Sequence, residues 1–352
     1  MQKNKRITFV EAINQALIFS MKKNKNVICY GLGINDPKAI FGTTKNLEKF
    51  FGKKRVFDVP TSENALTGIA IGASLGGIIP VVSHQRVDFF LLAMDQLVNG
   101  AAKWHYMFGS QISVPITIRL IIGRGWGQGP THSQNLHSWF AHIPGLKVVA
   151  PSNPNDAKSL LINSIEDPNP VIFFEHRWLH NSETNKLNKN SSVQIGKAKI
   201  VKKGSDITIV AMSYLVVEAL KASKILKDFR INAEVIDIRS IKPLDYKMIF
   251  SSVNKTKRIL VLDTGFEICS LASEIVTKVV KSKFNLLKSA PETITMPDVS
   301  EPTSYALTKN FYITHYEIVK KVLKIFKINK KFVNKEKNKH HDVPGDWFKG
   351  PF

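Results

Sequence analysis

The sequence is short of cysteine, of long apolar runs and of acidic residues. Only two of its 352 residues are cysteines, Cys29 and Cys269, and they lie far apart in the chain. This excludes a disulfide framework and favours a reducing compartment. No apolar run reaches the roughly 18 residues that a membrane-spanning helix needs. These absences exclude a disulfide-rich secreted protein and an integral membrane protein, and they predict a cytoplasmic chain with no membrane partner.

Basic residues outnumber acidic ones, 50 Lys and Arg against 28 Asp and Glu, which gives a net charge of +22. Either the charge forms a solvated lysine-rich surface, or it binds nucleic acid. The lysines are spread along the whole chain without a nucleic-acid motif, so we expect no nucleic-acid partner. Basic residues are concentrated only at positions 320–339, which hold nine Lys and one Glu. That stretch begins as an amphipathic helix whose apolar face we expect to be docked. The apolar positions are Ile318, Val322, Leu323, Ile325 and Phe326.

The apolar pattern predicts an α/β fold with two domains. The length suits two domains, and 43% hydrophobic residues are enough for a core in each. Alternating strands and helices predict parallel sheets. In the first half the expected strands are 26–30, 79–83, 116–121 and 171–174, and the expected helices are 62–75 and 89–107. In the second half the expected strands are 207–211, 233–238 and 259–263, with a helix at 214–227 capped by Ser213.

A polar, unpatterned stretch at residues 181–192 separates the two sets of elements. We therefore divide the chain into a first domain at 1–182, a linker at 183–192, a second domain at 193–330 and a basic and aromatic tail at 331–352. The tail carries Trp347, Phe348 and Phe352 among polar residues. Two interpretations stay open: these rings anchor the tail on a partner, or the tail folds back on its own domain.

A carboxylate, Glu63, lies in the first turn of a helix that is otherwise small and apolar. Glycine costs about 1 kcal/mol relative to alanine in a helix, so the many glycines here need a packing reason. They would let another backbone approach closely. Taken alone, Glu63 either satisfies the helix dipole or acts in a reaction. The small residues are Gly68, Gly72, Ala73, Gly76 and Gly77.

A glycine-rich loop at residues 123–134 follows the strand at 116–121 and delivers His132. α/β proteins bind their ligands at such strand ends. The glycine spacing matches neither the dinucleotide-binding fingerprint nor the phosphate-binding P-loop. Taken alone, His132 is a candidate functional residue or an ordinary loop histidine.

Six segments, in order and with almost no gaps, resemble one known family. They resemble the β subunit of thiamine-diphosphate-dependent 2-oxoacid dehydrogenase E1 components of the pyruvate and branched-chain type, within the transketolase-like superfamily. The resemblance extends from about Ile7 to Lys324. It implies a pyrimidine-binding domain with a parallel sheet, followed by a transketolase C-terminal-like domain. The segments are 58–68, 88–96, 101–106, 131–134, 144–151 and 166–170.

The resemblance also implies roles for particular residues. Glu63 matches the carboxylate that hydrogen-bonds N1′ of the aminopyrimidine of thiamine diphosphate. Phe89 matches the aromatic residue that stacks on this ring, although an ordinary core aromatic is the alternative. His132 matches the active-site histidine that orients the intermediate or moves protons during acyl transfer. A structural potassium ion, held mostly by backbone oxygens, is implied at Ile116, Ser164, Asp167 and Asn169.

The cofactor's diphosphate is anchored in the family through Mg²⁺ by a Gly-Asp-Gly…Asn element, and this chain has none. Its one Gly-Asp pair is Gly345-Asp346 in the tail. The resemblance therefore implies that an α subunit holds Mg²⁺ and the diphosphate in an α₂β₂ assembly. An acyltransferase core is a further implied partner. The implied reaction is decarboxylation of a 2-oxoacid such as pyruvate, with transfer of the acyl group to a lipoyl carrier.

Arg124 and Trp126 depart from what we expect of the pyruvate enzymes and keep a second function open. Arg124 either lies at the surface or faces the substrate pocket, where it would favour an anionic or phosphate-bearing reactant. This would suit a split transketolase-like carboligase that transfers a two-carbon unit to a sugar or other carbonyl acceptor. A non-catalytic basic scaffold or nucleic-acid-binding protein is the third hypothesis. The combination of Glu63, Phe89 and His132 argues against it.

Overall fold

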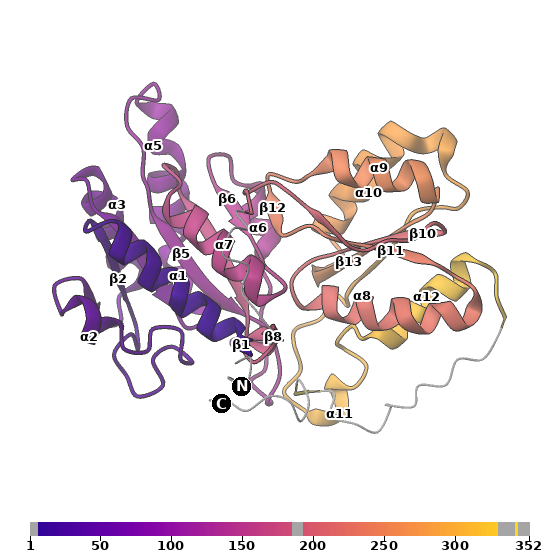
Figure 1. Ribbon diagram of the computed structural model, residues 1–352, viewed down its shortest axis with the longest axis horizontal. Helices are drawn as coiled ribbons and strands as arrows, with labels where there is room; N and C mark the ends of the chain where they lie inside the picture. The colour runs from indigo at the N-terminus through magenta and orange to yellow at the C-terminus, as the bar shows by residue number, and fades with distance from the viewer. Residues whose placement is uncertain (1–5, 185–192, 330–341, 344–352) are drawn as a thin grey trace, which may run out of the picture.

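The computed structural model describes residues 6–184, 193–329 and 342–343, which form two α/β units side by side (Figure 1). The first unit contains a seven-stranded sheet, parallel except for one edge strand. Its order is β12 (Ser240–Lys242), β6 (Lys147–Val149), β7 (Val171–His176), β5 (Thr117–Ile122), β4 (Ile79–His84), β2 (Val27–Gly31) and β3 (Val56–Asp58).

The second unit contains a five-stranded sheet in which only the edge strand β9 is antiparallel. Its order is β14 (Glu292–Met296), β13 (Ile259–Phe266), β10 (Ile207–Ala211), β11 (Ala233–Asp237) and β9 (Lys199–Lys202). A short antiparallel pair, β1 (Ile7–Thr8) and β8 (Glu183–Thr184), joins the two ends of the first unit. The predicted α/β class with two parallel-dominated sheets is confirmed.

Helices cover both faces of each sheet. On the first sheet, α1 (Phe9–Lys23) and α7 (Pro154–Ile165) pack on one face, and α3 (Glu63–Leu75) and α6 (His137–His142) on the other. On the second sheet, α8 (Tyr214–Ile225) and α12 (His315–Ile325) pack on one face, and α9 (Tyr246–Thr256) and α10 (Leu271–Lys283) on the other. The shorter helices are α2 (Leu47–Phe51), α5 (Ala102–Met107) and α11 (Tyr305–Thr308).

The strands are apolar at consecutive positions because both faces of each sheet are buried. In β7, Ile172 and Phe174 point into the cluster on the α3 side, and Phe173 points into the cluster with α1 and α7. The α3-side cluster continues into the second unit, where it includes Ile236 and Ile275. The two units therefore share one hydrophobic core across their interface.

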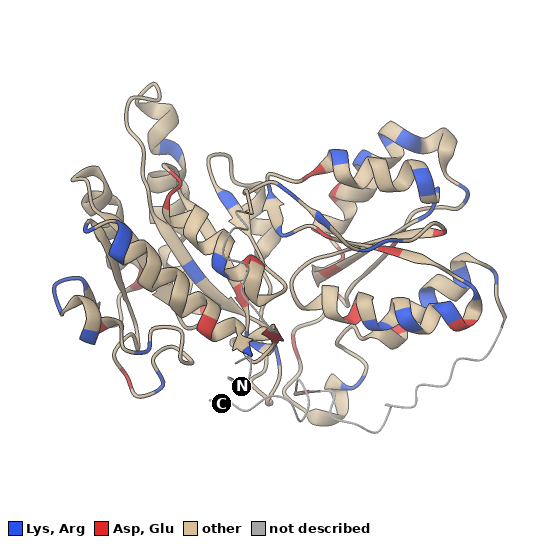
Figure 2. Ribbon diagram, viewed as in Figure 1, with Lys and Arg blue, Asp and Glu red and all other residues tan. Residues whose placement is uncertain are grey.

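Every strand that the sequence predicts is present, with ends that differ by three residues or fewer. The basic segment near the C-terminus also forms the expected docked helix, α12, whose Ile318, Val322 and Leu323 are buried. Figure 2 shows Lys and Arg on helices of both units, α12 among them.

One local prediction is confirmed in outline and another, the cap by Ser213, is wrong. The helical segment predicted at 89–107 is present without a break, but its type changes along its length: α4 (Val87–Phe90), a 3₁₀ turn at Leu91–Ala93, a π-helical turn at Gln96–Ala101, and α5. The π turn brings Gly100 so close to α3 that a Cβ there would lie 3.0 Å from Ile71 Cδ1. Ser213 precedes α8 but its hydroxyl does not cap the helix, because its φ of 50° lies outside the extended region that a capping residue adopts.

The predicted domain boundaries stay predictions. Residues 185–192 of the expected linker, and residues 330–341 and 344–352 of the expected tail with Trp347, Phe348 and Phe352, lie outside the described residues. In the part of the chain that is described, no helix is both long and apolar enough to cross a bilayer.

Polar groups also join the two units. Strand β12 of the second half extends the first sheet beside β6. Lys242 Nζ donates to the carbonyl oxygens of Ala141 (2.9 Å) and Ile143 (2.6 Å) at the end of α6. His137 Nε2 lies 2.8 Å from Asp263 Oδ1, and both side chains are buried. The units are thus fixed to each other by directional contacts as well as by the shared core.

Asp237, at the end of β11, makes this interface sensitive to pH. It is buried, and it accepts hydrogen bonds from Ser152 Oγ and from the Arg239 amide (3.0 Å). Burial raises its pKa to about 7; Asp156 adds to the effect, and Ser152 and Arg239 oppose it. The pKa of Asp237 is higher in the folded chain than in the unfolded chain. The contribution of Asp237 to stability is therefore complete at pH values below its unfolded pKa. It is lost as the pH rises through about 7.

We therefore expect Asp237→Asn to melt at a higher temperature than the parent at pH 8, with a smaller gap at pH 5. Thermal unfolding at the two pH values measures this. The exposed Asp228 provides the matched control, Asp228→Asn, which should melt like the parent at both. An equal gap for Asp237→Asn at pH 5 and pH 8 would contradict the assignment.

Candidate active site

The three residues that the sequence singles out follow three strands of the first sheet. Glu63 follows β3, Phe89 follows β4 and His132 follows β5. These strands are parallel, so their carboxyl ends meet at one edge of the sheet. That edge is where open α/β sheets bind their ligands.

Phe89 and His132 are in direct contact. Their ring centroids lie 5.3 Å apart with an interplanar angle of 88°, an edge-to-face arrangement. Asp88, next to Phe89, links this segment to the loop that carries His132. Its Oδ1 accepts hydrogen bonds from the amide (3.4 Å) and Nε2 (2.8 Å) of Gln134. The Thr131 hydroxyl lies 3.0 Å from His132 Nδ1, a hydrogen bond that orients the imidazole. The predicted aromatic and histidine therefore form one unit across two loops.

Glu63 is the first residue of α3 and only 5% exposed. Helix α3 is held by hydrogen bonds from Tyr30 Oη to the Leu66 carbonyl oxygen (2.8 Å) and from Asn64 Nδ2 to the Leu92 carbonyl oxygen (3.4 Å). Among the described residues, no side chain or amide donates to the Glu63 carboxylate. The Glu63 oxygens are not among the buried atoms that lack a partner, so they reach solvent and are open to a donor that a bound molecule brings.

Arg124 is enclosed by aromatic rings. Its guanidinium carbon lies 3.8 Å from the ring centroid of Trp178, 4.3 Å from that of Tyr312 and 5.3 Å from that of Tyr214. Trp178 follows β7 of the first sheet, whereas Tyr214 and Tyr312 belong to the second unit. Burial lowers the pKa of Arg124 and raises that of Tyr312 to about 12. We call these three rings with Arg124 the arginine cage; it joins the loop after β5 to both units.

Trp126 lies two residues further along the same loop, with φ at 55°. Its ring is 5.6 Å from the Arg177 guanidinium carbon, and its amide donates to the carbonyl oxygen of Asp342 (2.9 Å). The Arg124 side chain is buried within the arginine cage and is only 6% exposed. A direct contact of Arg124 or Trp126 with a substrate stays a prediction.

The four residues of the implied potassium site meet near the start of β5 and β7. The Ile116 carbonyl oxygen accepts from the Val171 amide (3.0 Å), and the Ser164 carbonyl oxygen accepts from the Asp167 amide (3.4 Å). Asp167 also accepts from the Asn169 amide (3.0 Å) and pairs with the Lys147 ammonium. The Asp167 charge is thus already neutralised within the chain, and potassium at this place stays a prediction.

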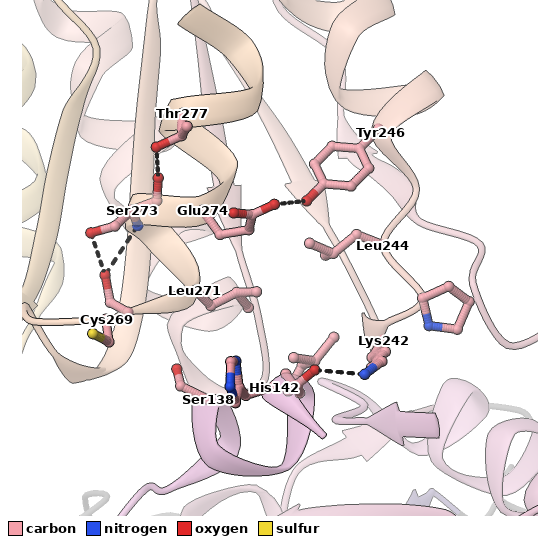
Figure 3. Close-up of a pocket in the computed structure, with 14 residues that line it drawn as sticks. Ser138, His142, Lys242, Leu244, Tyr246, Cys269, Leu271, Ser273, Glu274 and Thr277 are labelled. Carbon is pink, nitrogen blue, oxygen red and sulfur yellow. Dashed lines mark hydrogen bonds between the residues drawn. The ribbon is translucent and has the colours of Figure 1, made fainter. Parts of the chain in front are cut away.

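A cavity of about 760 Å³ lies between the units (Figure 3), and Glu63, Phe89 and His132 are not among the residues that line it. It is bounded by α6, β12, α9 and the start of α10. Its charged groups have partners within the chain: Lys242 bonds the end of α6, and Tyr246 Oη donates to Glu274 Oε1 (3.0 Å). This cavity is a feature of the interface between the units and not of the candidate active site.

Sequence reasoning missed several residues that shape the site. Asp88 lies inside a segment that resembles the family, so its place beside Phe89 was a usable signal. The partners of the loop after β5 gave no such signal, since they are distant in sequence and carry no motif. They are Trp178, Tyr214, Tyr312 and Asp342.

Comparison with known proteins agrees with this architecture. Residues 5–182 match the transketolase pyrimidine-binding domain and residues 196–318 match the transketolase C-terminal domain. The β subunit of pyruvate dehydrogenase E1 from Rickettsia bellii is 37% identical over 319 residues, which are 91% of this chain and 98% of the relative. The chain belongs to the E1 β-subunit family.

Proteins with other names are also similar to this chain. The β subunit of acetoin:2,6-dichlorophenolindophenol oxidoreductase from Bacillus subtilis is 38% identical over 331 residues, covering 91% of this chain and 97% of the relative. A solved structure titled as a split-gene transketolase, an inactive β₄ tetramer, has the same fold, with a TM-score of 0.75 at 21% identity. It covers 93% of this chain and all of that one. The family relationship confirms the resemblance read from the six segments.

The arginine cage predicts a large loss of stability on truncation. A desolvated cation–π contact contributes about 2 kcal/mol, and removing the side chain also leaves a cavity among the rings. We expect Arg124→Ala to lower the free energy of unfolding by about 2 kcal/mol or more. Urea denaturation measures this. Arg6→Ala, which removes an exposed arginine paired with Glu183 at 3.3 Å, should change it by less than about 1 kcal/mol. Equal effects of the two variants would contradict the cage's contribution.

Proposed function

We propose that this chain is the β subunit of a heteromeric thiamine-diphosphate-dependent enzyme. In this proposal it decarboxylates a 2-oxoacid such as pyruvate and transfers the acyl group to a lipoyl carrier. The observation that carries the proposal is the nearly buried Glu63 carboxylate, which has no donor among the described residues, at the sheet edge where Phe89 and His132 meet. The family relationship supports it.

The residues present fit the pyrimidine half of the cofactor. Glu63 would hold a proton between its carboxylate and the ring nitrogen, and Phe89 would supply an aromatic face. When bound, thiamine diphosphate supplies the carbon nucleophile that attacks the 2-oxoacid. His132, oriented by Thr131 and packed against Phe89, would orient the reacting group or transfer a proton to it.

A partner is needed to complete such a site. The surface around Glu63 supports one, since Ile69 of α3 and the neighbouring Leu92 are 61% and 67% exposed. Gly72 follows Ile69 by three residues on α3, and a Cβ there would meet no atom within 4 Å. Exposed apolar side chains near an open glycine suit close packing by another chain. We assign this face to an α subunit that holds Mg²⁺ and the diphosphate in an α₂β₂ enzyme.

The remaining assignments complete the proposal. Potassium would bind near Asp167, and an acyltransferase core would be the second protein partner. A cytoplasmic location suits the two cysteines, both of which are free thiols. The carboligase alternative differs only in the acceptor of the two-carbon unit.

The decisive experiment is co-expression with a chain that carries a Gly-Asp-Gly…Asn element, followed by assays of 2-oxoacid decarboxylation with thiamine diphosphate and Mg²⁺. Turnover that depends on lipoamide or on an artificial electron acceptor would support the dehydrogenase. Turnover that needs only a sugar aldehyde or ketone would favour the carboligase. Failure to form a complex with any such chain would contradict both.

Glu63→Gln is expected to abolish turnover while the fold is kept, because the amide cannot exchange a proton with the ring nitrogen. The measurements are CO₂ release, exchange of the cofactor's C2 proton by NMR, and the melting temperature. Glu48 also lies in the first turn of a helix, so Glu48→Gln is the matched control and should keep full activity. Retained turnover of Glu63→Gln would remove this residue from its assigned role.

His132→Ala is expected to leave C2-proton exchange near the parent rate and to slow acyl transfer by about 10²-fold or more, the usual size of a general acid–base contribution. Rapid-quench measurement of the two steps separates them. The exposed His142 serves as a control, and His142→Ala should change neither step. If His132→Ala stopped C2-proton exchange, the division of labour between Glu63 and His132 would be wrong.

A further inference from the structure

The loop that leads from β5 to His132 has few hydrogen bonds of its own. Residues 123, 125, 126, 127 and 129 all adopt positive φ; the four glycines do so at little cost, whereas Trp126, at a φ of 55°, holds a conformation that a residue with a side chain rarely adopts. Within the loop, the Gln128 amide donates to the Gly125 carbonyl oxygen at 3.2 Å and the His132 amide to that of Gly129 at 3.4 Å. A conformation this unusual persists only when its surroundings impose it.

One residue from beyond the second unit supplies several of these constraints. Asp342 is 5% exposed and accepts two consecutive loop amides. Its carbonyl oxygen accepts from the Trp126 amide (2.9 Å), and its Oδ2 accepts from the Gly127 amide (2.8 Å). Between them, the backbone and side chain of Asp342 satisfy two partly buried amide donors of the loop.

The fit between Asp342 and the loop is close and electrostatically favourable. A Cβ at Gly125, whose φ is +106°, would collide with the Asp342 carbonyl oxygen. The loop can therefore accept Asp342 only because this position is glycine. Burial lowers the pKa of Arg124, and the Asp342 carboxylate is one of the groups that oppose this shift.

We propose that Asp342 is a positioning residue for the active-site loop, and that it holds His132 in place by clamping residues 124–127. Asp342 lies 342 − 318 = 24 residues beyond the last residue that matches the transketolase C-terminal domain. The clamp is thus supplied by a part of the chain outside both matched domains. The two hydrogen bonds that define the clamp are made with the backbone of the loop.

Hydrogen exchange tests the clamp without any cofactor or partner. In Asp342→Ala, the Gly127 amide should exchange about tenfold faster, the effect of losing about 1.4 kcal/mol of protection. Asp342→Asn keeps an acceptor oxygen and should restore most of the protection. The exposed Asp228→Ala should exchange like the parent. Unchanged exchange across residues 123–132 in Asp342→Ala would overturn the proposal.

A kinetic experiment, which rests on the proposed function, tests whether the clamp positions His132. In the assembled enzyme, Asp342→Ala should lower acyl transfer about tenfold and leave C2-proton exchange unchanged, as expected of a residue that acts through His132. Asp342→Asn should recover most of this rate. Equal loss in both variants, or parallel loss of both steps, would mean a general structural defect and would overturn the positioning role.

The hydrogen-exchange and kinetic experiments together distinguish failure of the Asp342 clamp from failure of the proposed function. If no variant and no parent enzyme turned over, while exchange still rose in Asp342→Ala, the clamp would stand and the proposed function would fall. Gly125→Ala attacks the same contact from the loop side and should raise exchange at Trp126 and Gly127 with Asp342 intact. If Gly125→Ala left that exchange unchanged, Asp342 would not be seated against the loop.

Discussion

The enclosure of one buried cation governs the geometry of this site. Arg124 lies among Trp178, Tyr214 and Tyr312, so its loop can be formed only when both units are in place. An arginine taken out of water needs such compensation, since its desolvation would otherwise oppose folding. The position of His132, eight residues further along, is therefore a consequence of how the two units dock.

The same sheet edge explains why the site is incomplete in one chain. Parallel strands deliver Glu63, Phe89 and His132 to one side, but the exposed face of α3 beside them has nothing packed on it among the described residues. Ile69 and Leu92 leave apolar area in water there. Burial by a partner would gain roughly 25 cal/mol for each Å² removed from water. The same exposed face of α3 would therefore serve both to bind a partner chain and to complete the site.

Sequence reasoning predicted the strands and the family well, because both depend on local signals. Strands buried on both faces are uniformly apolar, and the segments around Glu63 and His132 keep their spacing. It predicted the helical segment at 89–107 but not the π turn within it, where Gly100 lies close to Ile71 and no periodicity indicates the change. It could not find the arginine cage or Asp342, whose contacts join residues that are more than 50 positions apart.

Several buried charged groups lie at the contacts between the units. Arg124, Asp237 and the His137–Asp263 pair all lie buried at or near that interface. Each has at least one partner from the other unit, so a small separation would remove partners from several buried groups at once. Such an interface resists gradual opening, because the first step is the costliest. The loop that carries His132 is held by the same interface through the arginine cage. Such a rigid attachment suits a residue that must meet a reacting group at a fixed position.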